Sequence, residues 1–154
     1  MSFQGKRAVV ELKSYIPGKP ESVFPLLCPV REYEWIDGWQ CEMVYSESGV
    51  AEDNCIFKTP VADHTMTWSV SRYEPPYRIE FVAVVPEQFV MRLNVVLDGV
   101  SNGTNLHWTR MFTGLSETGN GTVEKLAAEG RDKLVKLNQR LEHFVKTGSM
   151  LREA

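Results

Sequence analysis

The sequence predicts an α+β domain in which a curved antiparallel sheet of about seven strands wraps round one long C-terminal helix. Short alternating segments, separated by turn residues, fill most of residues 8–115, and their short connections favour antiparallel pairing. One stretch with helical periodicity, residues 122–146, follows them. Because a long apolar stripe needs a cover of similar length, we expect the sheet to curve round this helix.

Proline and glycine residues limit the length of the first strand and of the short helical pieces after it. Residues 8–16 (AVVELKSYI) alternate apolar and polar side chains before a Pro-Gly pair, which predicts a strand and a turn. In residues 19–30 (KPESVFPLLCPV), Pro20 suits the first turn of a helix, and two later prolines allow only short pieces. Residues 31–39 (REYEWIDGW) predict a second short helical turn that ends at Gly38.

Six further segments predict the rest of the sheet, each short and bounded by turn residues. The dipeptides at 86–87 (Pro-Glu), 98–99 (Asp-Gly) and 102–103 (Asn-Gly) predict tight connections, and Asn-Gly is typical of hairpins because both residues tolerate positive φ. The segments are QCEMVYSES (40–48), NCIFKTP (54–60), HTMTWSVSRYE (64–74), RIEFVAVV (78–85), QFVMRLNVVLD (88–98) and TNLHWTRMFTGL (104–115).

The C-terminal stretch predicts one amphipathic helix. Thr122 is a suitable N-cap and Gly148 a suitable stop, and the stretch before Thr122 (TGNG) is interpreted as a turn. At 1.5 Å per residue this helix would be ~36 Å long. Its apolar stripe is Val123, Leu126, Ala127, Gly130, Leu134, Leu137, Leu141 and Phe144.

Composition restricts the function classes. A chain of 154 residues predicts a single domain over residues 1–154, and a net charge of −3 argues against nucleic acid and anionic membrane surfaces as partners. No apolar run of ~18 residues predicts a membrane span, and the N-terminus lacks the apolar region of a signal peptide. Three cysteines, an odd count, favour reduced thiols, so we expect a cytoplasmic protein.

Three stretches carry a resemblance that covers essentially the whole chain. They are CPVREYEWIDGWQCEMVYSESG (28–49), TWSVSRYEPPYRIEF (67–81) and TNLHWTRMFTGL (104–115). Together with the order of elements, they resemble the SRPBCC or START-like superfamily, which has the helix-grip fold, and within it an uncharacterised bacterial branch similar to polyketide cyclases. The resemblance implies a cavity between sheet and helix that takes sterols, lipids, hormones or polyketides.

Alternation places a set of large apolar side chains on the inner face of the predicted sheet. Such side chains suit a cavity that moulds around an apolar ligand, although each one singly fits ordinary core packing better. In the resembled fold Trp35 and Trp39 fall near one end of the cavity. The candidate ligand contacts are Trp35, Trp39, Trp68, Phe81, Phe89, Met91, Trp108, Arg110 and Phe112.

Arg110 is the most informative of these residues, because it alternates with Trp108 and Phe112. On the apolar face it would be a buried charge that needs a partner, either Glu34, Glu80 or the carboxylate of a ligand. A bulge would instead turn Arg110 to solvent. The sequence leaves these two arrangements open.

Catalytic and metal motifs do not emerge from the pattern. His64, His107 and His143 are far apart and show no metal-ligand spacing, so no metal and no cofactor are expected. No GxSxG nucleophile motif occurs. No residue is therefore assigned a catalytic role.

Three functions follow as hypotheses. The first is a carrier that encloses one small apolar or amphipathic molecule. The second is a cyclase or dehydratase-like enzyme, with Arg110, Glu34 and Tyr73 as the first suspects. The third is a protein whose cavity is filled by its own side chains and which acts through its surface, for instance as a homodimer. Two titratable groups converging in a pocket would favour the enzyme, one or none the carrier, and no pocket volume the third.

Overall fold

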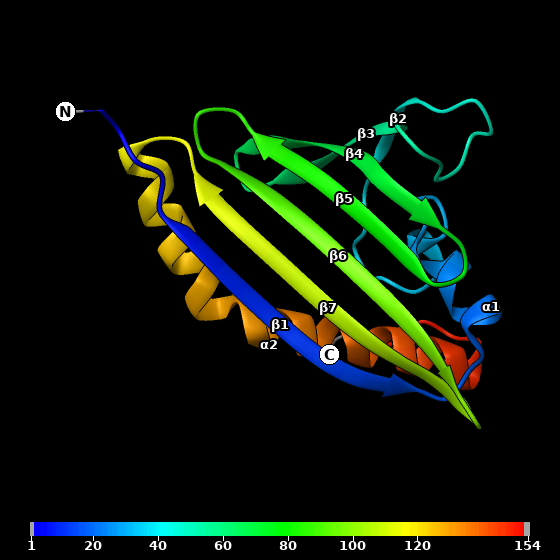
Figure 1. Cartoon of the computed structure of the whole chain (residues 1–154). Coiled ribbons are helices and arrows are strands. Elements are labelled where there is room, and N and C mark those ends of the chain that lie inside the picture. The colour runs from blue at the N-terminus through cyan, green and yellow to red at the C-terminus, as the bar shows by residue number, and fades with distance from the viewer. Residues whose placement is uncertain (1, 153–154) are drawn as a thin grey trace.

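One antiparallel sheet of seven strands dominates the computed structural model, which describes residues 2–152 (Figure 1). The strands lie in the order β1-β7-β6-β5-β4-β3-β2, so β1 and β2 form the two edges. The predicted sheet and its antiparallel pairing are confirmed. The strands are β1 (Arg7–Ile16), β2 (Glu42–Tyr45), β3 (Ile56–Val61), β4 (His64–Glu74), β5 (Arg78–Val85), β6 (Phe89–Val100) and β7 (Gly103–Gly114).

Two long hairpins build the centre of the sheet. β5 and β6 pair from Val85 and Phe89 outward, as the Pro-Glu pair between them predicts. β6 and β7 stay paired to the end of β6, where Val100 lies opposite Gly103. The expected break at residues 98–99 is wrong, because both residues continue the ladder with β7 and the chain turns only at residues 101–102.

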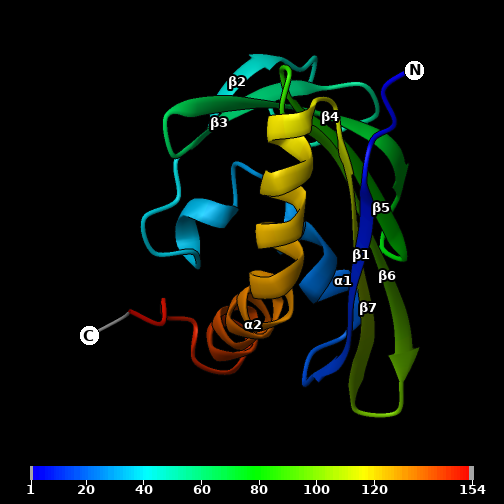
Figure 2. The same cartoon turned by 90° about the vertical axis from the view of Figure 1, so that its left-hand side faces the viewer.

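The short helical pieces predicted after the first strand are present, and they cover one end of the concave face (Figure 2). They are α1 (Pro20–Val23) and two 3₁₀ turns, η1 (Phe24–Leu27) and η2 (Glu32–Glu34). Val23, Phe24 and Leu27 are buried there beneath the sheet. Proline at the start of α1 and of η1 keeps both pieces short.

The C-terminal helix α2 (Glu117–Thr147) begins five residues earlier than the sequence predicts. Ser116 is the true N-cap, and its side chain accepts a hydrogen bond from the Gly119 amide. The predicted stop is confirmed, since Gly148 takes a left-handed conformation with φ of 71°. None of the described helices combines the length and apolar content that a membrane span requires.

Tertiary packing explains the early start of α2. A Cβ on Gly119 would lie 1.8 Å from the backbone oxygen of Gln88, so only glycine lets the helix approach the β5–β6 turn this closely. Glycine is a poor helix former, which is why the sequence pattern favoured a turn here.

Helix α2 packs mainly against β1 and β7, along one side of the concave face (Figures 1 and 2). Leu134 and Leu141 of its stripe are fully buried, and Gly130 contacts Val10 of β1. The predicted inner faces are confirmed by burial, for example of Phe81, Met91, Trp108 and Phe112. The strands on the other side of the sheet are left for the short helical pieces and for a cavity.

We expect Gly119→Ala to lower the free energy of unfolding by about 2 kcal/mol or more, because the added methyl group overlaps the Gln88 carbonyl. Gly121→Ala is the matched control: this helical glycine is exposed with open space around it, so alanine should add about 0.5–1 kcal/mol. Urea unfolding of both variants measures the difference. Equal effects at the two sites would contradict the close approach.

Candidate functional site

A cavity lies between the concave face of the sheet, η2 and α2. It has an inner chamber of about 180 Å³ and an adjoining outer chamber of about 330 Å³. Ile36, Trp39, Trp68 and Arg110 line both chambers, so the two are continuous along these side chains. The molecule therefore keeps internal space that its own side chains do not fill.

Aromatic packing fixes one wall of the inner chamber. Phe57 stacks on Trp68 with ring centroids 5.4 Å apart, and Phe81 meets Trp68 edge-on at 5.8 Å. The Trp68 indole N–H donates to Thr59 Oγ1 at 2.9 Å, which sets the orientation of the ring. A rigid aromatic wall of this kind is pre-organised for a flat apolar group.

Trp108 joins the sheet to the helix beside the chamber. Its indole N–H donates to Asn138 Oδ1 of α2 at 3.1 Å, and Ser14 of β1 donates to the same oxygen at 2.7 Å. Asn138 is buried, so these two bonds satisfy its amide oxygen in the core. The network holds α2 at a fixed position relative to β1 and β7.

The structure decides the direction of Arg110. β7 pairs with both neighbours without a bulge, so Arg110 joins Trp108 and Phe112 on the concave face. Its Nε atom is buried and has no hydrogen-bond partner within residues 2–152. Burial lowers the pKa of Arg110, and the charge of Glu32 acts in the opposite direction. An unsatisfied buried N–H donor is costly, so this group is the outstanding feature of the cavity.

Glu32 is the acidic group that faces Arg110, and the sequence reasoning missed it. Desolvation raises its pKa from 4.5 to about 8, although the nearby positive charge of Arg110 lowers it. No ion pair or hydrogen bond holds the Glu32 carboxyl within the described residues. At neutral pH it is therefore mainly a neutral carboxylic acid that can donate its O–H into the inner chamber.

The geometry of a 3₁₀ turn explains why Glu32 faces inward and Glu34 does not. With three residues per turn, side chains at i and i+3 share a face, so Glu32 lies on the side of the fully buried Trp35. Glu34 projects about 240° round the turn from Glu32. The spacing of Glu32 from Trp35 is the sequence signal that could have identified this residue.

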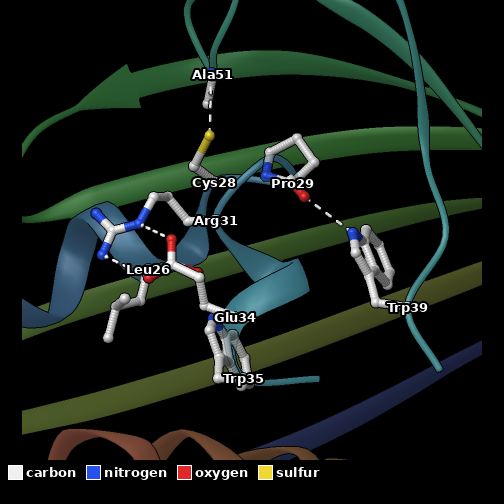
Figure 3. A network of polar contacts seen from close by, with 8 residues as sticks. All are labelled: Leu26, Cys28, Pro29, Arg31, Glu34, Trp35, Trp39 and Ala51. Atoms are coloured by element: carbon white, nitrogen blue, oxygen red, sulfur yellow. Dashed lines mark hydrogen bonds and ion pairs between the residues drawn. The ribbon is translucent and has the colours of Figure 1, made fainter. Parts of the chain in front are cut away.

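The two protein side chains expected as partners of Arg110, Glu34 and Glu80, form ion pairs elsewhere. Glu34 pairs with Arg31 on the surface at 2.5 Å (Figure 3). Glu80 pairs with Arg92 at 2.9 Å and accepts from a serine hydroxyl at 2.8 Å, on the outer face of the sheet. Tyr73, a suspected catalytic residue, lines a different pocket and packs on Phe24 with centroids 5.6 Å apart.

Of the nine predicted contacts, eight line the two chambers. Trp35 is the exception: it is fully buried, and its indole N–H donates to the Leu26 carbonyl at 2.7 Å, so it packs beneath the short helical pieces (Figure 3). Trp39 is half-buried at the cavity, with its N–H bonded to the Pro29 carbonyl at 2.9 Å. The other seven are Trp68, Phe81, Phe89, Met91, Trp108, Arg110 and Phe112.

No set of three or more histidine, cysteine or acidic side chains in the described part of the chain is grouped to hold a metal ion. The three cysteines are free thiols. The Cys28 side chain has a structural contact, since its sulfur accepts a hydrogen bond from the Ala51 amide at 3.3 Å (Figure 3). The polar chemistry of the cavity therefore rests on Arg110 and Glu32.

No protein-family model matches this sequence, and no curated protein matches it. Many solved structures are similar in fold, including Ara h 8.0201, CalU16 and DynU16. Ara h 8.0201 is 12% identical with a TM-score of 0.68, and the match covers 92% of this chain and 99% of that one. CalU16 from Micromonospora echinospora is 14% identical with a TM-score of 0.58, over 89% and 85% of the two chains.

DynU16, a protein of the dynemicin biosynthetic locus, is 17% identical with a TM-score of 0.64 over 92% of this chain. The match covers 48% of DynU16, so this chain spans about half its length. At these identities the likeness concerns the fold. It confirms the helix-grip fold that the sequence predicts.

We expect the free energy of unfolding to fall as pH rises from about 4.5 to 8, because Glu32 has the higher pKa in the folded state and so keeps a proton that the unfolded chain releases. Glu32→Gln should remove this slope. A shift of one pKa unit corresponds to about 1.4 kcal/mol, and water in the cavity reduces the effect. The free energy of unfolding of the variant should therefore exceed that of the wild type by about 2 kcal/mol at pH 8 and equal it near pH 5. Urea unfolding across this range measures it.

Glu34→Gln is the control, since Glu34 is exposed and paired on the surface. It should keep the pH dependence of the wild type. If Glu32→Gln keeps that dependence too, the Glu32 carboxyl is not desolvated.

Proposed function

We propose that the protein binds one small hydrophobic or amphipathic molecule in the cavity between sheet and α2, with the polar end of the ligand at Arg110. The observation that carries the proposal is the buried Arg110 Nε, which lacks a hydrogen-bond partner within residues 2–152. It lies in a chamber whose lining is apolar except for Arg110 and Glu32. A ligand acceptor would satisfy that donor.

The size of the cavity supports a ligand with at least one ring. A dry apolar cavity of about 150 Å³ takes benzene. The inner chamber, at about 180 Å³, has room for one ring beside Trp68 and Trp108, and the outer chamber for a second group. This open volume argues against the hypothesis of a core filled by its own side chains.

An enzyme that uses the same cavity is the second candidate, and Glu32 is the observation that favours it. Two titratable groups, Glu32 and Arg110, converge on the inner chamber. A carboxyl with a pKa of about 8 can act as general acid near neutral pH, while a guanidinium stabilises an oxyanion that develops on a carbonyl substrate. A cyclase or dehydratase-like reaction would need both roles.

Native mass spectrometry of the purified protein is the direct test. A bound small molecule, identified after denaturation, would support the proposal and supply the compound to assay for turnover. Absence of any adduct, together with no binding of neutral aromatic probes, would contradict it. The same spectra report whether the protein is a monomer or a homodimer. We also propose a cytoplasmic location, because an odd number of cysteines, three, favours reduced thiols.

Filling the inner chamber should weaken ligand binding. Val95 is buried and lines this chamber, so Val95→Phe should weaken binding of the neutral fluorophore N-phenyl-1-naphthylamine by at least about tenfold. Val96→Phe is the matched control, because Val96 is the next residue on the same strand and lies outside both chambers. Probe fluorescence gives the affinities, and circular dichroism checks the fold. Equal binding by both variants would place the probe outside the inner chamber.

A further inference from the structure

We infer that the cavity selects ligands that carry a carboxylate, held between the guanidinium of Arg110 and the carboxyl group of Glu32, which line the same chamber. The inference rests on the proposed function, since it names the chemical class of the ligand for the same cavity. It also predicts that binding depends on the proton of Glu32.

The donors of Arg110 fit a carboxylate better than a neutral acceptor. Nε–H and one Nη–H form a planar fork, which matches the two oxygens of a carboxylate and gives charge-assisted hydrogen bonds. In this protein the Nε–H side of the fork is buried without a partner within residues 2–152. Most of the side chains around it are apolar, and a low local dielectric strengthens a charge-assisted hydrogen bond made there.

Glu32 does not itself serve as the anionic partner of Arg110, so a ligand carboxylate can bind there. An ionised Glu32 would neutralise Arg110, yet no ion pair within 4.0 Å joins the two side chains within the described residues. The raised pKa of Glu32 also indicates that the two groups do not neutralise each other, because desolvation of the carboxyl outweighs its attraction to Arg110. The pair thus presents one positive charge and an additional O–H donor to the chamber, and a carboxylate can accept from both groups.

Other charged groups near the cavity are already paired. In the outer chamber Lys133 pairs with Glu129 at 3.2 Å, and Asp37 pairs with Arg152 at 3.4 Å. Arg140 of α2 donates to the Asp37 carbonyl at 3.1 Å.

Cys41, which senses the charge of Glu32, has a thiol whose pKa burial raises above 9.0. Between pH 6.5 and 9, Glu32 is therefore the group facing Arg110 whose charge changes. When Glu32 loses its proton, the net charge of the pair falls from +1 to zero, and the ionised carboxyl repels a bound carboxylate. Affinity for an anion should consequently fall as pH rises.

Two probes of the same shape test the inference: 2-naphthoate, which carries the carboxylate, and neutral 2-naphthamide. Because three tryptophans line the chambers, quenching of intrinsic fluorescence reports binding, with calorimetry as confirmation. The wild type should bind naphthoate at least about tenfold more tightly than naphthamide at pH 7. Between pH 7 and 9 its affinity for naphthoate should fall several-fold, while that for naphthamide stays constant.

Three variants separate the two groups. Arg110→Met should lose the preference for naphthoate yet keep naphthamide binding, with stability equal to or above that of the wild type because an apolar side chain replaces a buried charge. Glu32→Gln should keep the preference and make it independent of pH. Arg72→Met, which removes an exposed arginine elsewhere on the sheet, should behave as the wild type.

The outcomes distinguish this inference from the proposed function. Equal affinities of the wild type for the two probes, or undiminished naphthoate binding by Arg110→Met, would overturn the carboxylate selectivity and leave the proposed function standing. A naphthoate affinity that is constant with pH in the wild type would overturn the role of the Glu32 proton. Failure of both probes, and of the neutral fluorophore, to bind would overturn the proposed function itself.

Discussion

The packing of α2 against β1 and β7 is the constraint on which the rest of the structure depends. One helix can cover only one side of a seven-stranded concave face, so its buried leucines and the hydrogen bonds from Trp108 and Ser14 to Asn138 fix it there. The face of β3 to β6 must be covered in another way. The short helical pieces between β1 and β2 do this only in part, and the space that remains is the cavity.

Arg110 lowers the stability of the core in which it lies. A buried guanidinium N–H donor without a hydrogen-bond partner among the described residues costs free energy that an apolar side chain at the same position would not. Buried polar groups that the protein leaves unsatisfied tend to mark functional sites, because a ligand or a reacting group can satisfy them. The neutral Glu32 carboxyl strengthens this interpretation, since it stays apart from Arg110 and leaves the charge available.

The η2 turn links the fold to the chemistry of the cavity. Trp35 anchors this turn in the core through its bond to the Leu26 carbonyl, and the threefold repeat of the turn then directs Glu32 to the chamber. Trp39, four residues after Trp35, lines both chambers. The aromatic residues of this segment thus have two different tasks, anchoring and lining.

Local pattern by itself determined the strands, their inner faces, the β5–β6 hairpin and the glycine that ends α2, because alternation, turn chemistry and left-handed glycine act over a few residues. It also placed Arg110 on the face of Trp108, but it could not exclude a bulge. Only the tertiary structure decided that Gly119 belongs to the helix, that Glu34 pairs at the surface and that Glu32 faces Arg110. These outcomes depend on how segments distant in sequence are placed, such as Gly119 against Gln88, or η2 and β7 at the same chamber. They also depend on burial, which no local pattern specifies.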